Sequence, residues 1–110
     1  MAKSEKKDKL MFYIYDGDST KEIHIFSAPN PKRAVEKAVV REEDNSIHNY
    51  VVRREDRDWG KRYQGRRAVL NPPMIIERAG VRISITKVAE DVKQTSDEHV
   101  IFKINRRSTN

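Results

Sequence analysis

Residues 50–67 hold the side chains of this sequence that are best suited to chemistry, because they combine many cations with flat rings. The cations are Arg53, Arg54, Arg57, Lys61, Arg62, Arg66 and Arg67, and the rings are Tyr50, Trp59 and Tyr63. Three carboxylates oppose the seven cations, so the stretch carries +4 of the formal net charge of +6. Cations displace the counterions condensed on a polyphosphate, and rings lie against sugars or bases. The pattern therefore favours a nucleic-acid surface, although a solvated hairpin whose long side chains cover its own strands would have the same composition.

The sequence shows no arrangement typical of an enzyme or a metal site. The histidines, His24, His48 and His99, lie in separate segments without metal-ligand spacing. The run Asp16-Gly17-Asp18 is similar to the start of a calcium loop, but Lys21 replaces the glycine that such a loop needs and Ser27 replaces its final glutamate. The glycines form no phosphate-binding fingerprint, and no serine or carboxylate pair has the partners that catalysis needs. We therefore predict no enzymatic activity, cofactor, metal site or small-molecule substrate.

Length and composition predict one small domain with a polyanionic partner. A chain of 110 residues has room for one modest core, and 23 Lys and Arg exceed 17 Asp and Glu. The absence of cysteine fits a reducing compartment, and no stretch approaches the roughly 20 apolar residues that cross a bilayer. We expect a soluble, intracellular monomer with no membrane partner. It should consist of a disordered lysine-rich tail at 1–9, a single domain at 10–105 and a loose end at 106–110.

Runs of alternating apolar residues separated by turn residues predict six or seven short strands. The predicted strands cover 10–15, 22–26, 47–55, 61–66, 74–78, 81–88 and 100–104. The Pro72-Pro73 pair is expected to interrupt the chain, because proline cannot donate to a ladder. In the hairpin that follows, Val81, Ile83 and Ile85 should point to one face. The polar and acidic stretch 89–98 is expected to be a loop.

One helix is predicted to follow the second strand. Asn30 can cap it, and Pro31 suits its first position. Its apolar stripe consists of Ala34, Val35, Ala38 and Val39. Arg33 and Lys37 lie one turn apart beside this stripe and are further candidate contacts for a polyanion. The fold predicted from these elements is α+β, a small curled antiparallel sheet or open barrel with one helix after the second strand.

This order of elements, together with two short motifs, resembles the monomeric chromosomal protein of methanogenic archaea. The helix region matches that family through Phe26, Ser27, Pro31, Ala34, Lys37 and Ala38. Residues 63–73 and 78–83 are closer in style to small relatives of the family in large DNA viruses. Ala28 stands where the family has glycine, and Trp59 precedes the arm in which the archaeal protein carries its tryptophan.

The resemblance, which covers about residues 10–88, implies a non-enzymatic chromatin-like protein. Such a protein binds duplex DNA as a monomer with little sequence preference, and bends or compacts it in a nucleoid, a virion or a viral factory. The candidate nucleic-acid contacts are Arg33, Lys37, Arg53, Arg54, Arg57, Trp59, Lys61, Arg62, Tyr63, Arg66, Arg67, Arg78 and Arg82. Two alternatives remain open. One is an RNA-binding component of a ribonucleoprotein that stacks bases on its tyrosines, and the other is an interaction module for an acidic protein.

Overall fold

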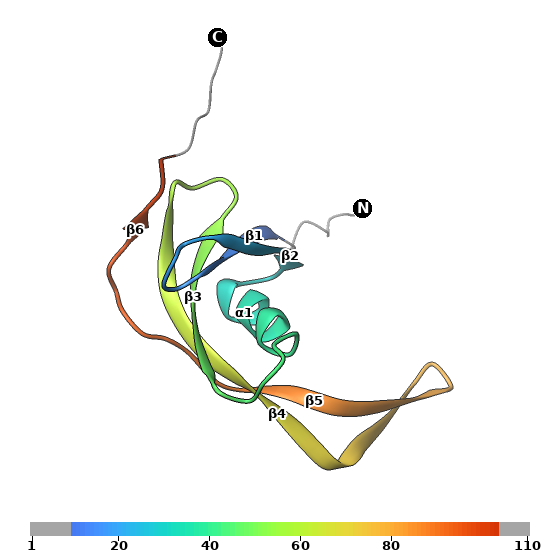
Figure 1. Cartoon of the computed structure of the whole chain (residues 1–110). Helices are drawn as coiled ribbons and strands as arrows, with labels where there is room; N and C mark the ends of the chain where they lie inside the picture. Colours follow the sequence, from blue (N-terminus) through green and yellow to red (C-terminus); the bar gives the residue numbers. More distant parts are fainter. Residues whose placement is uncertain (1–9, 104–110) are drawn as a thin grey trace, which may run out of the picture.

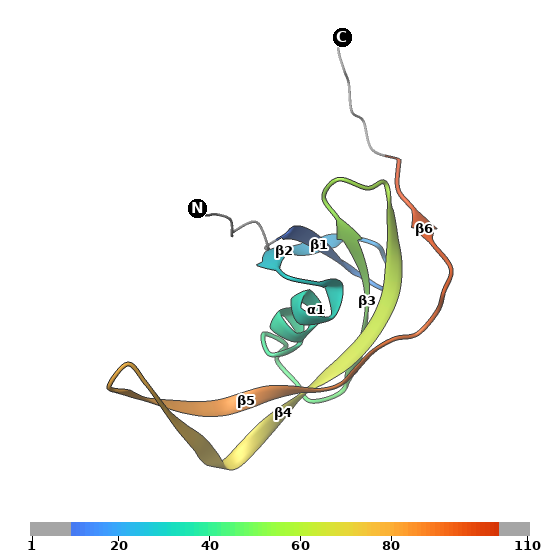
Figure 2. The same cartoon turned by 180° about the vertical axis from the view of Figure 1, so that it is seen from behind.

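The computed structural model describes residues 10–103 (Figures 1 and 2). The elements follow in the order β1 Leu10–Asp16, β2 Glu22–Ala28, α1 Pro31–Val39, β3 Ile47–Arg54, β4 Trp59–Arg78, β5 Val81–Gln94 and β6 Val100–Ile101. The predicted tail at 1–9 and the loose end at 106–110 lie outside the described residues. Within the described part, no helix is both long and apolar enough to cross a membrane.

The strands form an antiparallel sheet in the order β2-β1-β3-β4-β5. β6 pairs with the start of β4, along the edge that β5 occupies further on, with Trp59 opposite Ile101 and Gly60 opposite Val100. Within residues 10–103 the two end strands of this order do not pair with each other, so the sheet stays open. The prediction of an α+β protein with one helix after the second strand is confirmed at this level.

The helix α1 lies across one face of the sheet and forms the core with it (Figure 1). Asn30 caps it as expected, since its side-chain oxygen accepts the backbone N–H of Arg33 at 2.9 Å, and Pro31 occupies the first position. The helix buries its whole predicted stripe against the sheet. The buried core consists of Phe12, Ile14, Ala28, Ala34, Val35, Ala38, Val39, Tyr50, Val52 and Tyr63. We call the helix-covered side of the sheet its front face and the opposite side its back face.

β4 and β5 continue past the helix as a two-stranded ribbon, residues 68–88, which we call the arm (Figures 1 and 2). The Pro72-Pro73 pair interrupts the ladder as expected, since no residues pair across the strands between Val69 and Met74. The separate strands expected on either side of the prolines are wrong, because β4 continues through them as one strand. β5 extends to Gln94, so the loop expected at 89–98 begins only after that residue.

Candidate nucleic-acid interface

The cations of residues 53–67 do not form one surface, because successive strand residues point to opposite faces. On β4, Tyr63 faces the core, so its neighbour Arg62 and also Arg66 lie on the back face. By the same alternation, Lys61 and Arg67 lie on the front face. Each side chain therefore has to be judged by its own contacts.

Arg53 is buried, with 7% of its surface exposed. Its Nε donates to the Tyr15 hydroxyl at 2.9 Å and its Nη1 to the Arg57 carbonyl at 2.7 Å. The guanidinium also lies 4.5 Å from the ring centroid of Tyr13. This side chain organises the β3–β4 turn from inside, and its burial does not agree with the prediction that it contacts phosphate. We therefore leave Arg53 out of the proposed interface.

Trp59 holds the segment that follows β5 rather than presenting a free ring. The imidazole of His99 stacks on it with the centroids 4.0 Å apart and the planes 5° from parallel. The guanidinium of Arg57 lies 4.8 Å from the same centroid. The partly exposed indole is thus in contact with a ring of the chain at 95–103, and this geometry favours Trp59 as an anchor for that segment.

Two other predicted contacts are neutralised by carboxylates of the same chain. Arg54 makes a bidentate pair with Asp56, both bonds being 2.7 Å, and this pairing lowers the pKa of the Asp56 carboxyl. Arg66 lies 2.9 Å from Asp91 and 2.8 Å from Glu90, which together raise its pKa. The pairs leave each arginine with little net charge to offer a polyanion.

Three more cations, Lys61, Arg62 and Arg67, donate to uncharged acceptors, so these contacts do not offset their positive charge. Lys61 Nζ donates to the Asp97 carbonyl at 3.0 Å, and Arg62 Nη1 to the Gly17 carbonyl at 3.0 Å. Arg67 makes three such bonds, all to the loop that follows α1. These hydrogen bonds hold the three side chains against neighbouring loops of the protein.

The tyrosines predicted to stack bases in an RNA-binding protein are mostly inside the protein. Tyr15, Tyr50 and Tyr63 have 7%, 1% and 8% of their surface exposed. Burial raises the pKa of the Tyr63 hydroxyl, and burial with the Glu42 hydrogen bond raises that of Tyr50. An RNA platform made of these rings has no support from this arrangement.

Arg33 and Lys37 lie one turn apart on the exposed side of α1. Arg33 pairs with Glu36 at 3.1 Å, whereas the Lys37 ammonium donates only to a backbone carbonyl at the end of β2. With Val88 and Ala89 of β5 they line a shallow groove between α1 and the base of the arm. The groove is the point where the helix cations and the arm meet.

The two faces of the arm differ in character. Met74 lies opposite Ile85, Ile76 opposite Ile83, and Arg78 opposite Val81. Directly opposite residues share a face, so one face contains Val69, Met74, Ile76, Arg78, Val81, Ile83, Ile85 and Lys87. We call this the apolar face of the arm; it holds two cations and no carboxylate. The other face contains Ala68, Ile75, Glu77, Arg82, Ser84 and Val88, with the predicted contact Arg82 opposite Glu77.

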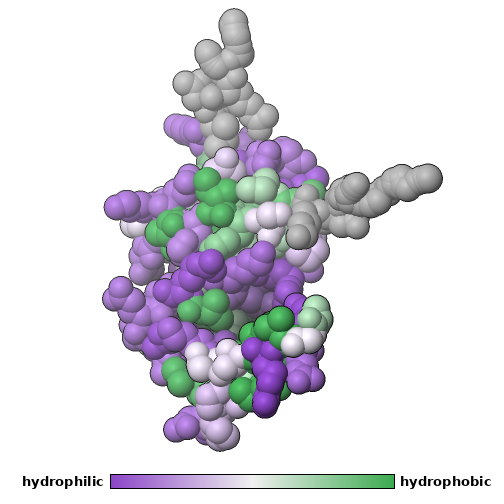
Figure 3. All heavy atoms as spheres, turned by 90° about the vertical axis from the view of Figure 1, so that its right-hand side faces the viewer, coloured by the Kyte–Doolittle hydropathy of each residue, from purple (hydrophilic) through white to green (hydrophobic). Residues whose placement is uncertain are grey.

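Much of the apolar face is open to solvent. Val81 is 59% exposed, Met74 48% and Ile83 38%. Figure 3, which faces the free end of the arm, shows apolar side chains in separate patches among hydrophilic ones. Several exposed apolar side chains therefore share one face of the arm without forming a continuous patch.

No protein-family model, curated protein or solved structure matches the chain. The resemblance to the methanogen chromosomal protein therefore stays a prediction. Among the described residues, no cluster of His, Cys, Asp or Glu is placed to hold a metal ion.

Lys87 is a cation on the apolar face of the arm that was not predicted from the sequence. It lies opposite Val69 on the apolar face and, like Arg78, has no ion-pair partner among the described residues. The signal was present in the alternation of Val81, Ile83 and Ile85, which places the next odd-numbered residues of β5 on the same face.

Proposed function

We propose that this chain is a non-enzymatic architectural protein that binds duplex DNA with little sequence preference, and bends or compacts it. The interface that we propose consists of the apolar face of the arm and the exposed side of α1. It differs from the cation-rich stretch 53–67 that the sequence indicated, because most of those side chains contact the protein's own groups.

The observation that carries this proposal is the composition of the apolar face. A row of Met, Ile and Val side chains is flanked by Arg78 and Lys87, with no carboxylate among the paired residues of that face. Architectural DNA-binding proteins insert Ile, Met or Leu side chains into the minor groove while cations contact the adjacent phosphates.

The shape of the arm and its chemistry agree with recognition that does not depend on sequence. Two-stranded ribbons twist strongly, which allows one face to follow a groove. The paired side chains of the apolar face offer no hydrogen-bond acceptor to bases, and its two cations suit phosphates. At the base of the arm, Arg33 and Lys37 extend the positive surface onto α1, and we propose that a duplex that contacts both elements is bent there.

A competition experiment tests the choice of partner. A fluorescent duplex of mixed sequence is bound at one fixed salt concentration and displaced by unlabelled duplexes, single strands and structured RNA. We expect unrelated duplexes to compete equally and better than single strands or RNA. Stronger competition by RNA would replace the proposal with an RNA-binding function. No detectable duplex binding at low salt would exclude it.

A further inference from the structure

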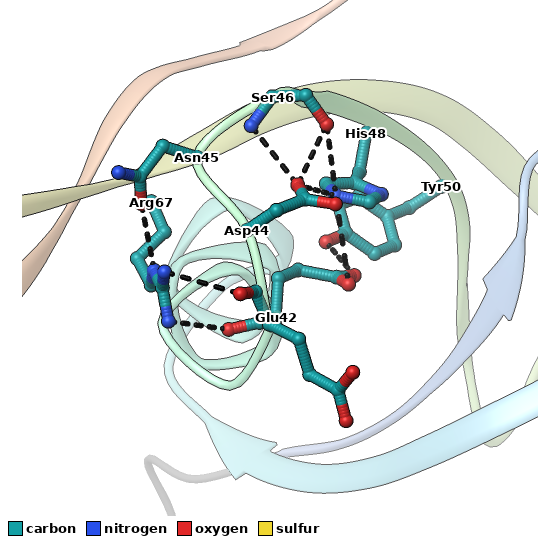
Figure 4. A network of polar contacts seen from close by, with 8 residues as sticks. Glu42, Asp44, Asn45, Ser46, His48, Tyr50 and Arg67 are labelled. Atoms are coloured by element: carbon teal, nitrogen blue, oxygen red, sulfur yellow. Dashed lines mark hydrogen bonds and ion pairs between the residues drawn. The ribbon is translucent and has the colours of Figure 1, made fainter.

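The base of the arm is tied to the loop that follows α1 by one side chain. Arg67 of β4 donates from Nε to the Asn45 side-chain oxygen at 2.8 Å, from Nη1 to the Glu42 carbonyl at 2.9 Å and from Nη2 to the Glu43 carbonyl at 3.3 Å (Figure 4). The planar guanidinium fork thus donates to acceptors of Glu42, Glu43 and Asn45 in one orientation. None of the three is a carboxylate, so the contact is geometric rather than an ion pair.

The loop that receives Arg67 is itself held in place. Asp44 accepts bonds from the Ser46 backbone N–H at 3.0 Å and hydroxyl at 2.6 Å, and the His48 Nε2 lies 2.8 Å from the same carboxylate oxygen. Tyr50, which is buried in the core, donates its hydroxyl to Glu42 at 2.6 Å (Figure 4). The acceptors of Arg67 are therefore connected to β3 and the core, and do not move freely with the arm.

On the opposite face of the base of the arm, a second arginine forms salt bridges. Arg66 links β4 to Glu90 and Asp91 of β5, which keeps the two strands of the ribbon together. That contact joins β4 to β5 at the base of the arm and sets no angle between the arm and the helix. Of these two neighbouring arginines, only Arg67 connects the ribbon to the segment that leaves α1.

From these contacts we propose that Arg67 is a positioning residue that fixes the inclination of the arm relative to α1. Because the proposed interface has one part on the arm and one on the helix, Arg67 would thereby set the bend of a bound duplex; this second step rests on the proposed function. Arg67 is then not a phosphate ligand, which is the role that the sequence indicated.

The first test needs the protein alone. The chain has no cysteine, so spin labels can be attached at Ser84→Cys on the arm and Lys32→Cys on α1, both at exposed positions. We expect Arg67→Met to broaden or shift the distribution of the label-to-label distance. The matched control is Arg62→Met, which removes the same charge from β4 but only one bond, to the Gly17 carbonyl on the back face. An unchanged distribution in Arg67→Met would overturn the proposal.

Milder variants keep the test decisive if Arg67→Met does not fold. Asn45→Ala removes one acceptor and Arg67→Lys keeps the charge without the fork, so each should broaden the distribution less than a complete loss of the contact. Distributions identical to wild type in both variants would overturn the proposal as well.

The second test separates positioning from phosphate binding. For a duplex labelled at both ends, Arg67→Met should change the end-to-end fluorescence distance of the complex while the slope of log K against log salt stays as in wild type. A slope shallower by about 0.9 with an unchanged distance would instead identify a phosphate contact and refute the positioning role. If wild-type protein binds no duplex, the proposed function fails, and the spin-label distances still decide whether Arg67 holds the arm.

Discussion

Replacing Lys87 by glutamine should weaken duplex binding, whereas the same replacement at Lys93 should not. Both lysines are exposed residues of β5, and both changes remove one positive charge. Lys87 lies on the apolar face of the arm opposite Val69, whereas Lys93 lies opposite Gln64 on the back face of the sheet. The pair therefore separates a local contact from a general effect of net charge.

The size of the effect follows from counterion release. Three exposed cations of the proposed interface, Lys37, Arg78 and Lys87, have no carboxylate partner in the described part of the chain, and Arg33 has one. Three to four phosphate contacts give a slope of log K against log salt of about −3. Loss of one contact should make the slope shallower by about 0.9, which corresponds to about eightfold weaker binding at 0.1 M salt.

Fluorescence anisotropy of a labelled duplex, titrated at several salt concentrations, gives both the affinity and the slope. Thermal unfolding of each variant serves as the control for folding. Equal losses in Lys87→Gln and Lys93→Gln would show that net charge, and not the apolar face of the arm, governs binding.

Three further changes test other parts of the account. Ile83→Ser should reduce duplex bending while Ile75→Ser, on the other face of the arm, should not; end-to-end fluorescence distances measure both, and equal effects would contradict the assignment of faces. Arg53→Met should lower the free energy of unfolding by roughly 1–3 kcal/mol, because it leaves the acceptors of Arg53 without a donor. The duplex affinity of the folded fraction should stay unchanged. Urea unfolding and fluorescence anisotropy measure the two quantities, and a large loss of affinity would restore Arg53 to the interface. Hydrogen bonds from Ser46 and His48 lower the pKa of the Asp44 carboxyl below its ordinary value of 3.8. The ionised carboxylate therefore stabilises the fold above that pH, and this contribution is lost as the pH falls through the folded-state pKa. Asp44→Asn should flatten the decline of stability below about pH 4, and an unchanged acid-unfolding profile would count against the contact.

The helix α1 and the hairpin at the tip of the arm could be predicted from the local sequence pattern. The helix α1 followed from Asn30 as cap, Pro31 in the first turn and an apolar stripe that is wholly buried in the structure. The hairpin at the tip of the arm followed from the alternation of Val81, Ile83 and Ile85. In each case the signal lies within about a dozen residues, which is the range over which periodicity informs.

The path of the arm and the contacts of its base could not be predicted, because they depend on pairing between distant segments. The acidic residues Glu90 and Asp91 suggested a loop, yet they lie in β5, where Arg66 offsets their charge. Alternation showed that neighbouring arginines point to opposite faces, but not that the acceptors of Arg67 lie more than twenty residues earlier in the chain. The partner of Trp59 likewise lies forty residues away, at His99.

We expect the arm and α1 together to bend a bound duplex. The most direct measurement is the end-to-end fluorescence distance of a short labelled duplex as wild-type protein is added. We predict that the distance shortens to a plateau as the protein saturates the duplex, and that it recovers when salt releases the protein. A duplex that becomes fully bound while its ends stay as far apart as in free DNA would contradict the account.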